Sequence, residues 1–313
     1  MSSIEPRHVF GPVPSRRLGR SLGVDLVPFK VCTYDCVYCQ LGRTTDKTVE
    51  RREYVPTTAV LEEIEKKLEA GIDADFITLS GSGEPTLHAG CGEIIRGIKR
   101  LTQTPVAVLT NGSLLSDPEV REELMAADLL VPSLDAGDEK AFERVNRPHP
   151  AIRFETLVAG LVSARQAFRG RYWLEVFLLE GSTATDVQIA RIANHVRRID
   201  PDRVHLNTVA RPPAEDAAIA VAVAEMRRLA EAFGDTAEVV ADFVDVHRDS
   251  RFTAGRDEVA ALLRRRPCTV ADVAASLRMH RNEALKHLDA LVTEGAVQYE
   301  TVGEQRFFVC ASR

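Results

Sequence analysis

The stretch that decides the fold is the run at residues 31–40, Val31-Cys32-Thr33-Tyr34-Asp35-Cys36-Val37-Tyr38-Cys39-Gln40. Its three cysteines, Cys32, Cys36 and Cys39, follow the spacing C-x3-C-x2-C. A cubane iron-sulfur cluster takes four thiolates, so a loop that offers three leaves one iron open to a small chelating molecule. That molecule could receive an electron from the cluster. The loop therefore predicts a cluster whose open iron carries the chemistry.

Two other uses of these cysteines compete with a cluster. A structural zinc site needs a fourth ligand at comparable spacing, and the nearest downstream candidates, His88 and Cys91, are single residues. A disulfide framework needs an oxidising compartment, but residues 1–10 carry charges and no apolar core of a signal peptide. Six cysteines in 313 residues are also few for a secreted framework. We therefore favour the cluster.

The cysteine loop, with the aromatic Tyr38 directly before its third cysteine, resembles the radical S-adenosylmethionine (SAM) superfamily. The resemblance implies that Cys32, Cys36 and Cys39 hold a 4Fe-4S cluster and that Tyr38 lies beside the cofactor. It also implies that the open iron binds the amino and carboxylate groups of SAM. The reduced cluster would then cleave SAM to methionine and a 5'-deoxyadenosyl radical.

Strand-like and helix-like segments alternate along the first 233 residues, which is typical of parallel βαβ units. We expect strands at residues 22–27, 76–79, 106–109, 129–134, 173–178 and 204–207. We expect helices at residues 58–70, 92–101, 118–127, 153–168, 186–199 and 215–233. The superfamily resemblance implies that these α/β units form a partial (β/α)6 TIM-like barrel. A doubly wound open sheet is the alternative, and in both folds ligands bind at the carboxyl ends of the strands.

A glycine-rich loop, Ser80-Gly81-Ser82-Gly83-Glu84-Pro85-Thr86, follows the second expected strand. Glycine lets the backbone approach a ligand closely. The loop resembles the "GGE" element of the superfamily, which grips the SAM amino group, with Ser82 at the first glycine position. The resemblance assigns cofactor contacts to Ser82, Gly83, Glu84 and Pro85. A plain turn is the alternative.

Polar residues also follow the later strands, where they would face the barrel mouth. Asn111 and Asp135 end the third and fourth strands, although a turn and a helix cap explain them as well. Glu175 interrupts the fifth strand, and a buried carboxylate needs a partner. Asn207 ends the sixth strand, where the superfamily places the SAM ribose and adenine. Arg147 lies in a stretch, residues 142–150, that we expect to be extended; it could meet the SAM carboxylate or pair on the surface.

Residues 10–26 are rich in glycine, proline and arginine, so we do not expect ordinary core there. Together with the cysteine loop and Ser133-Leu134-Asp135, they resemble a bacterial and archaeal subgroup of radical SAM proteins grouped with the tRNA wyosine synthases. Those synthases carry further cysteines for a second cluster. Here Cys91, Cys268 and Cys310 are scattered, so we expect buried thiols, no second cluster and no wyosine chemistry proper.

The C-terminal part predicts a small winged helix-turn-helix domain. Three helices at residues 258–266, 269–277 and 281–294 precede a hairpin at residues 297–309. We place the barrel and its N-terminal extension at residues 1–245, a linker at 246–256 and the winged helix at 257–313. The third helix presents Arg281 and Lys286, which could bind nucleic acid, whereas Tyr299, Phe307 or Phe308 could bind a peptide or protein. A structural cap of the barrel is the third possibility.

Charge does not decide among these partners. The formal net charge of the chain is −6, which argues against a wholly basic surface for nucleic acid. Residues 251–313 hold 10 Lys and Arg against 8 Asp and Glu, a net charge of +2. That is a weak footprint for phosphate binding.

The leading interpretation is a radical SAM enzyme that modifies an RNA base, a peptide or a small metabolite. The alternative is an iron-sulfur redox-sensing DNA-binding regulator. We expect a reductant such as flavodoxin or ferredoxin as a partner. No apolar run reaches the ~18 residues of a membrane helix, so we expect a soluble cytoplasmic protein. The cluster and Glu84 lie in the barrel, so we expect uncoupled SAM cleavage not to need residues 251–313.

Overall fold

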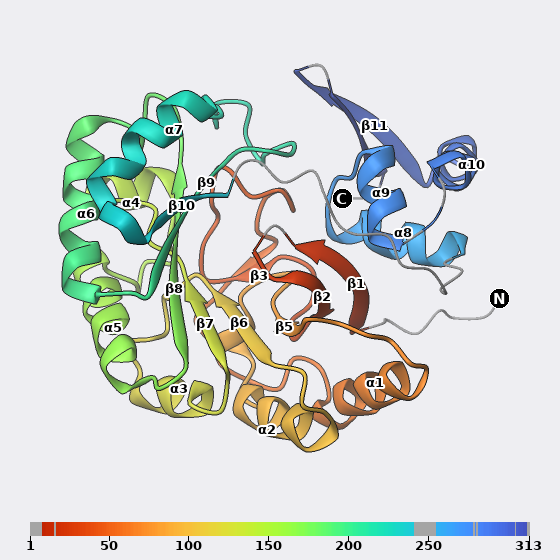
Figure 1. The fold of residues 1–313 in the computed structure, drawn as a ribbon, viewed down its shortest axis with the longest axis horizontal. Helices are drawn as coiled ribbons and strands as arrows, with labels where there is room; N and C mark the ends of the chain where they lie inside the picture. Colours follow the sequence, from red (N-terminus) through yellow and green to blue (C-terminus); the bar gives the residue numbers. More distant parts are fainter. Residues whose placement is uncertain are drawn as a thin grey trace.

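The computed structural model describes residues 8–240 and 255–311, apart from positions 16, 278, 280 and 304. Most of these residues form one α/β body, and a smaller helical unit lies against one edge of its sheet (Figure 1). In the described part of the chain, no helix combines the length and the apolar character that crossing a bilayer requires.

The large sheet has eight strands that lie side by side in the order in which they occur along the chain. Its spatial order is β1-β2-β5-β6-β7-β8-β9-β10. A doubly wound sheet would reverse its order at a switch point, so the partial barrel is confirmed. All neighbouring strands are parallel except β1 and β2. The strands are β1 (Val9–Ser15), β2 (Gly19–Val24), β5 (Phe76–Leu79), β6 (Val106–Thr110), β7 (Leu129–Pro132), β8 (Arg171–Leu178), β9 (Arg203–Thr208) and β10 (Ala237–Val239).

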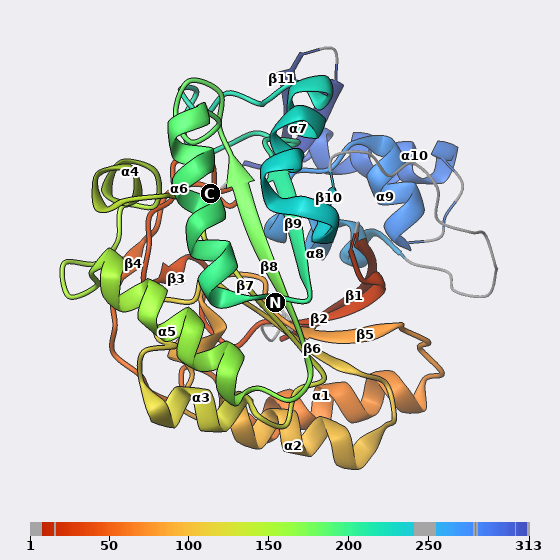
Figure 2. The ribbon, with the colours of Figure 1, turned by 60° about the vertical axis from the view of Figure 1, so that its left-hand side comes forward.

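Helices cover the outer face of this sheet (Figures 1 and 2). They are α1 (Thr57–Glu69), α2 (Cys91–Leu101), α3 (Pro118–Leu124), α5 (Phe154–Ala167), α6 (Asp186–Ile199) and α7 (Val223–Ala230). Two of them begin at residues whose side chains cap the helix: the Asp117 carboxylate accepts a hydrogen bond from Glu119 N, and the Thr185 hydroxyl accepts one from Gln188 N. Aliphatic side chains of the helices and strands form one continuous core.

Shorter elements occupy the connections. These are the strands β3 (Val31–Cys32) and β4 (Asp46–Lys47), the 3-10 helices η1 (Pro85–Leu87) and η2 (Glu231–Thr236), and the helix α4 (Glu139–Val145). Strands β3 and β4 pair with each other, apart from the large sheet. Along the chain, β3 contains the first cysteine of the loop, and β4 follows the third.

The structure corrects four predicted elements. Residues 9–15 form an edge strand with Val9 and Val13 buried, so this segment does contribute to the core. The first parallel strand ends at Val24 rather than at residue 27. Helix α4 covers the start of a segment that we expected to be extended, because Asp138 caps it through Ala141 N. The last barrel helix begins at Val223 instead of residue 215, because the preceding loop is engaged elsewhere: Glu215 N donates to Val37 O.

The C-terminal unit, residues 255–311, has the predicted order of three helices and a hairpin. Its elements are α8 (Arg256–Arg265), α9 (Val270–Leu277), α10 (Arg281–Thr293), β11 (Val297–Val302) and β12 (Gln305–Cys310). The predicted linker lies almost wholly outside the described residues. Helices α8 and α9 contact β1, and Val13 of β1 belongs to the apolar core of the unit. The hairpin and α10 point away from the barrel (Figure 1).

A buried ion pair joins the unit to the barrel. Arg265 Nε donates to Asp25 Oδ2 at 2.8 Å, and the two side chains are 10% and 9% exposed. The Arg265 guanidinium also lies over the ring of Phe10, 4.2 Å from its centroid. On the barrel side, Ser82 N donates to Asp25 Oδ1 at 2.8 Å. Asp25 therefore links α8 directly to the glycine-rich loop.

We predict that Arg265→Ala lowers the free energy of unfolding by about 3–5 kcal/mol, because it leaves a buried carboxylate without its cation. Burial raises the pKa of Asp25, and Arg265 opposes that rise, so the variant raises this pKa further. A carboxyl with a raised pKa takes up a proton on folding, and its stabilising effect is lost as the pH rises. The loss of unfolding free energy in the variant should therefore be largest at neutral pH. It should shrink as the pH is lowered toward the ordinary aspartate pKa of about 3.9.

Chemical denaturation at several pH values measures this effect. Arg264, the preceding residue, is exposed, so Arg264→Ala is the matched control and should change stability little. Equal losses in the two variants, or a deficit that does not change with pH, would contradict the assignment.

Candidate functional site

The carboxyl ends of the barrel strands open into a cavity of about 420 Å³. Cys32, Cys36 and Cys39 all line it, as do the backbone of Gly81 and Gly83 and the strand-end residues Asn111, Asp135, Glu175 and Asn207. The structure thus gathers most of the predicted site at one place. The C-terminal unit closes part of the wall with Leu262, Arg265 and Arg266, which the sequence alone did not indicate.

Each thiol of the loop has a nitrogen donor beside it. Lys30 Nζ lies 3.2 Å from Cys39 Sγ, Asn111 Nδ2 lies 3.6 Å from Cys32 Sγ, and Asn146 Nδ2 lies 3.5 Å from Cys36 Sγ. Hydrogen bonds to cluster sulfurs are one of the means by which proteins adjust a cluster. These contacts fit a cluster with one thiolate on each of three irons. Among the described residues, no three His, Cys, Asp or Glu side chains converge on one point that could hold a single metal ion.

Burial alone would keep two of these thiols protonated. It raises the pKa of Cys32 to about 12, with a further contribution from the nearby Glu84 carboxylate. It also holds the pKa of Cys36 well above its ordinary value. A thiol in such surroundings needs a bound metal to remain a thiolate at neutral pH. The site is thus suited to a cluster and poorly suited to a free nucleophilic cysteine.

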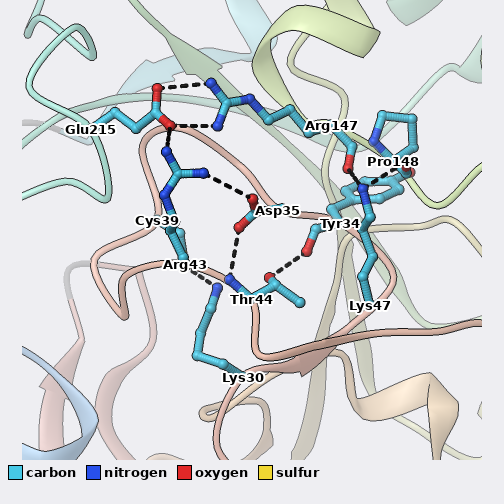
Figure 3. Close-up of polar contacts among 10 residues, drawn as sticks. All are labelled: Lys30, Tyr34, Asp35, Cys39, Arg43, Thr44, Lys47, Arg147, Pro148 and Glu215. Atoms are coloured by element: carbon cyan, nitrogen blue, oxygen red, sulfur yellow. Dashed lines mark hydrogen bonds and ion pairs between the residues drawn. The ribbon is translucent and has the colours of Figure 1, made fainter. Parts of the chain in front are cut away.

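The segment from α4 to Pro150 braces the cysteine loop from outside. Asp35 N donates to Asn146 O at 3.0 Å, Val37 N donates to Val145 O at 3.0 Å, and His149 N donates to Thr33 O at 2.8 Å. Lys47 Nζ, from β4, donates to Arg147 O at 3.2 Å (Figure 3). These backbone contacts fix the loop in the orientation that presents its cysteines to the cavity.

Ion pairs around Glu215 complete the brace. Arg147 Nη2 donates to Glu215 Oε2 at 2.8 Å, and Arg43 pairs with the same carboxylate (Figure 3). Arg43 also lies 3.7 Å from the Asp35 carboxylate, whose Oδ1 accepts from Thr44 N. Of the two roles expected for Arg147, the structure favours pairing within the protein over contact with SAM: Glu215 engages its guanidinium, and Arg147 is absent from the cavity wall.

The glycine-rich loop approaches the cysteine loop backbone to backbone. Glu84 N donates to Val31 O at 3.1 Å, and Lys30 N donates to Ser82 O at 2.6 Å. A Cβ added to Gly83 would lie 1.9 Å from Val31 O, so only glycine fits there. Ser82 and Pro85 do not line the cavity. Ser82 instead uses its backbone to connect Asp25 and Lys30.

The Glu84 carboxylate is an anchor within the protein. Its Oε1 accepts hydrogen bonds from Thr86 N, Thr86 Oγ1 and Thr110 Oγ1, and its Oε2 accepts one from Asn111 N. The residue is only 2% exposed. Glu84 thus ties the loop after β5 to the end of β6, and it also lines the cavity.

The comparisons with known proteins agree with this geometry. The family described as the Radical SAM superfamily matches residues 26–239 of this chain. The chain belongs to the radical SAM superfamily. A UPF0026 protein of Helicobacter pylori (strain J99) is 34% identical over 307 residues, which are 97% of each chain.

Other relatives share only part of their length with this chain. A protein of Brachyspira hyodysenteriae named GTPase Obg is 36% identical over 304 residues, which are 96% of this chain but 45% of that protein. A UPF0026 protein of Methanocaldococcus jannaschii is 36% identical over 208 residues, 66% of this chain and 64% of the relative. A solved radical SAM methyltransferase from Sphaerobacter thermophilus has the same fold, with a TM-score of 0.53 at 18% identity over 70% of this chain and 66% of that one.

Members of the radical SAM superfamily use a 4Fe-4S cluster and SAM, and the residues present here fit both. Tyr38 packs its ring on Phe177, with centroids 4.0 Å apart and planes at 11°, and donates its hydroxyl to Asp135. Asp135 also accepts from Phe177 N at 2.9 Å and from Asn146 Nδ2 at 2.7 Å. Burial raises the pKa of Asp135 to about 6, against the effect of these donors. This cluster of side chains forms a rigid, partly aromatic wall beside the thiols.

Glu175 faces the cavity, a direction that its place in an aliphatic strand leaves open. It pairs with Arg17 and accepts a hydrogen bond from Asn207 Nδ2 at 3.0 Å. Burial would raise the pKa of Glu175, but Arg17 and Asn207 hold it below its ordinary value. Its charge is thus neutralised by the protein, and the Asn207 amide is oriented at the end of β9.

Two residues beside the cysteine loop, Lys30 and Asn146, were not predicted from the sequence. Lys30 is buried and has a left-handed backbone with φ 60°, a conformation that a residue other than glycine adopts at a cost. Although burial lowers the pKa of Lys30, the three cysteines together raise it. Asn146, the C-cap of α4, contacts Cys36, and this helix was not predicted. The unusual backbone of Lys30 has no clear sequence signature.

We predict that Cys36→Ala abolishes cluster binding after anaerobic reconstitution, because two thiolates cannot hold a cubane that already has one open iron. Iron and acid-labile sulfide should fall from about four of each per chain to near zero. Cys91 is buried and does not line the cavity, so Cys91→Ala is the control and should retain the cluster. Stoichiometric zinc without labile sulfide in the unaltered protein would sink the assignment.

Proposed function

We propose that this protein is an enzyme that reductively cleaves SAM and uses the resulting 5'-deoxyadenosyl radical to modify a substrate held at the barrel mouth. The observation that carries the proposal is the single cavity shared by three thiols, the Gly81 and Gly83 backbone and the strand-end residues Asn111, Asp135 and Asn207. When bound, the cluster supplies the electron that breaks the carbon–sulfur bond of SAM. The protein places SAM and excludes water.

Each group of the protein has a definite part in this proposal. The thiolates of Cys32, Cys36 and Cys39 hold the cluster, and Lys30, Asn111 and Asn146 offer donors to their sulfurs. The loop backbone, anchored by Glu84, receives the SAM amino group. The Tyr38 and Phe177 rings and Asn207 border the rest of the cofactor. The comparisons give no support to a redox-sensing DNA-binding regulator.

We predict that the reconstituted protein, given SAM and a strong reductant, forms 5'-deoxyadenosine slowly without substrate, as measured by chromatography. Glu84→Ala should weaken SAM affinity about tenfold or more, because it removes the four hydrogen bonds that fix the loop, and binding must then order a freed loop.

The exposed glutamate of α2, Glu93, supplies the control, since Glu93→Ala should leave SAM affinity unchanged. The cluster content of both variants should match that of the unaltered protein. Loss of the cluster in Glu84→Ala would assign Glu84 to the cysteine loop rather than to SAM placement.

We also propose that the C-terminal unit is a winged helix that binds RNA, and that this RNA carries the base that the enzyme modifies. Helix α10 packs on α8, α9 and β11 and has no extensive contact with the described barrel. Arg281, Asn282 and Lys286 are exposed on it. On the hairpin, Arg306 lies over the ring of Tyr299, which is 55% exposed. Phe307 and Phe308 are buried, so they are not available to a peptide. A modified tRNA base is the substrate that the subgroup resemblance favours.

We predict that Arg281→Ala and Lys286→Ala each reduce the salt slope of tRNA binding by about one, because each removes one phosphate contact. Filter binding over a range of salt concentrations measures the slope. Arg144 is exposed on the barrel helix α4, so Arg144→Ala should leave the slope unchanged. Binding that is insensitive to salt but lost in Tyr299→Ala would instead identify a peptide or protein partner.

A further inference from the structure

The wall that the C-terminal unit adds to the cavity is cationic. Arg265 and Arg266, at the end of α8, line the cavity together with Arg211 from the loop after β9. Arg265 is neutralised by Asp25, and Arg17, on the barrel wall, is neutralised by Glu175. Arg211 and Arg266 differ from these two arginines because neither has a carboxylate closer than 3.5 Å among the described residues.

The partners of these two arginines leave donors unused. Arg211 Nε donates to Pro267 O at 3.1 Å, and its Nη2 lies 3.5 Å from the Asp272 carboxylate. Arg266 Nη2 donates to Ser276 Oγ at 3.2 Å. Within the described parts of the chain, Arg266 has no carboxylate partner, and its Nε is shielded from solvent without a hydrogen bond. A desolvated N–H group without an acceptor is unfavourable.

A role in helix capping does not account for Arg266. The residue is the C-cap of α8, and its backbone N donates to Leu262 O. A basic side chain at this end of a helix can bind the last carbonyl groups. Here, however, the side chain turns to Ser276 on α9, and it lines the cavity. Its free donor therefore needs another explanation.

The two guanidinium groups also disfavour each other. Burial lowers the pKa of Arg211, and the charge of Arg266 lowers it further, against the opposing effect of Asp272. Two cations held together in a partly desolvated wall destabilise the empty site. An anion between them would relieve that repulsion and accept the unused hydrogen bonds.

We propose that Arg211 and Arg266 form an oxyanion subsite that binds a phosphate or carboxylate group of the substrate. The planar fork of arginine suits both groups, because it donates two parallel hydrogen bonds to neighbouring oxygens. The proposal rests on the proposed function, since it assigns a substrate to the same cavity. An oxyanion held at α8 keeps the attached molecule in the cavity that the thiols share.

The experiment uses the full chain with its cluster and measures binding of inorganic phosphate and of acetate by calorimetry. Arg211→Gln and Arg266→Gln should each weaken binding of the preferred anion by about tenfold to 100-fold, the effect of one charge-assisted contact. Arg266→Lys should fall between, because it keeps the charge and loses the fork. The exposed neighbour Arg264 provides the control Arg264→Gln, which should bind as the unaltered protein does.

Preference for phosphate over acetate would identify a phosphate group, and the reverse a carboxylate. The subsite is overturned if neither anion binds, if neither glutamine variant weakens binding, or if the variants lose SAM affinity instead, since the pair would then hold the SAM carboxylate. Arg266→Gln decides the matter if Arg211→Gln proves too unstable by denaturation. Anion binding that depends on Arg266, in a protein that forms no 5'-deoxyadenosine, would support the subsite and contradict the proposed function.

Discussion

Asp25 carries a carboxylate that is almost wholly removed from water, and both of its oxygens accept hydrogen bonds. Oδ1 accepts from Ser82 N in the glycine-rich loop, and Oδ2 accepts from Arg265 in α8. A buried carboxylate is strongly unfavourable unless it is paired in this way. Asp25 therefore holds the glycine-rich loop and α8 together, because each of them supplies one of its hydrogen-bond donors. Through Ser82 O the chain of contacts continues to Lys30, whose amino group lies beside Cys39. The C-terminal unit is thereby joined to the loop that holds the cluster.

The cysteine loop itself has little regular structure and depends on its surroundings. Its backbone is tied to residues 145–149, and the Glu215 carboxylate holds Arg43 and Arg147 on its outer side. This outer brace leaves the inner side free for the thiols. A loop that is fixed by backbone hydrogen bonds loses little further freedom when it binds a cofactor, which favours binding.

The C-terminal unit has two distinct faces. One face, made by α8 and α9, packs on β1 and contributes arginines to the cavity, while α10 and the hairpin extend outward. The C-terminal unit therefore lines part of the cavity, while the cysteines and Glu84 lie in the barrel. One unit thus both closes part of the cavity wall and extends away from the barrel.

Local spacing was enough to predict the three cysteines as candidate cluster ligands, the glycine-rich loop and the positions of most strands, because those signals lie within a few residues of one another. The parallel order then placed Asn111, Asp135, Glu175 and Asn207 at one edge. Spacing could not predict that Arg147 would be captured by Glu215, or that Arg265, 240 residues after Asp25, would reach the same loop. Those outcomes depend on which buried charges find partners when distant segments pack, and only the tertiary structure decides that.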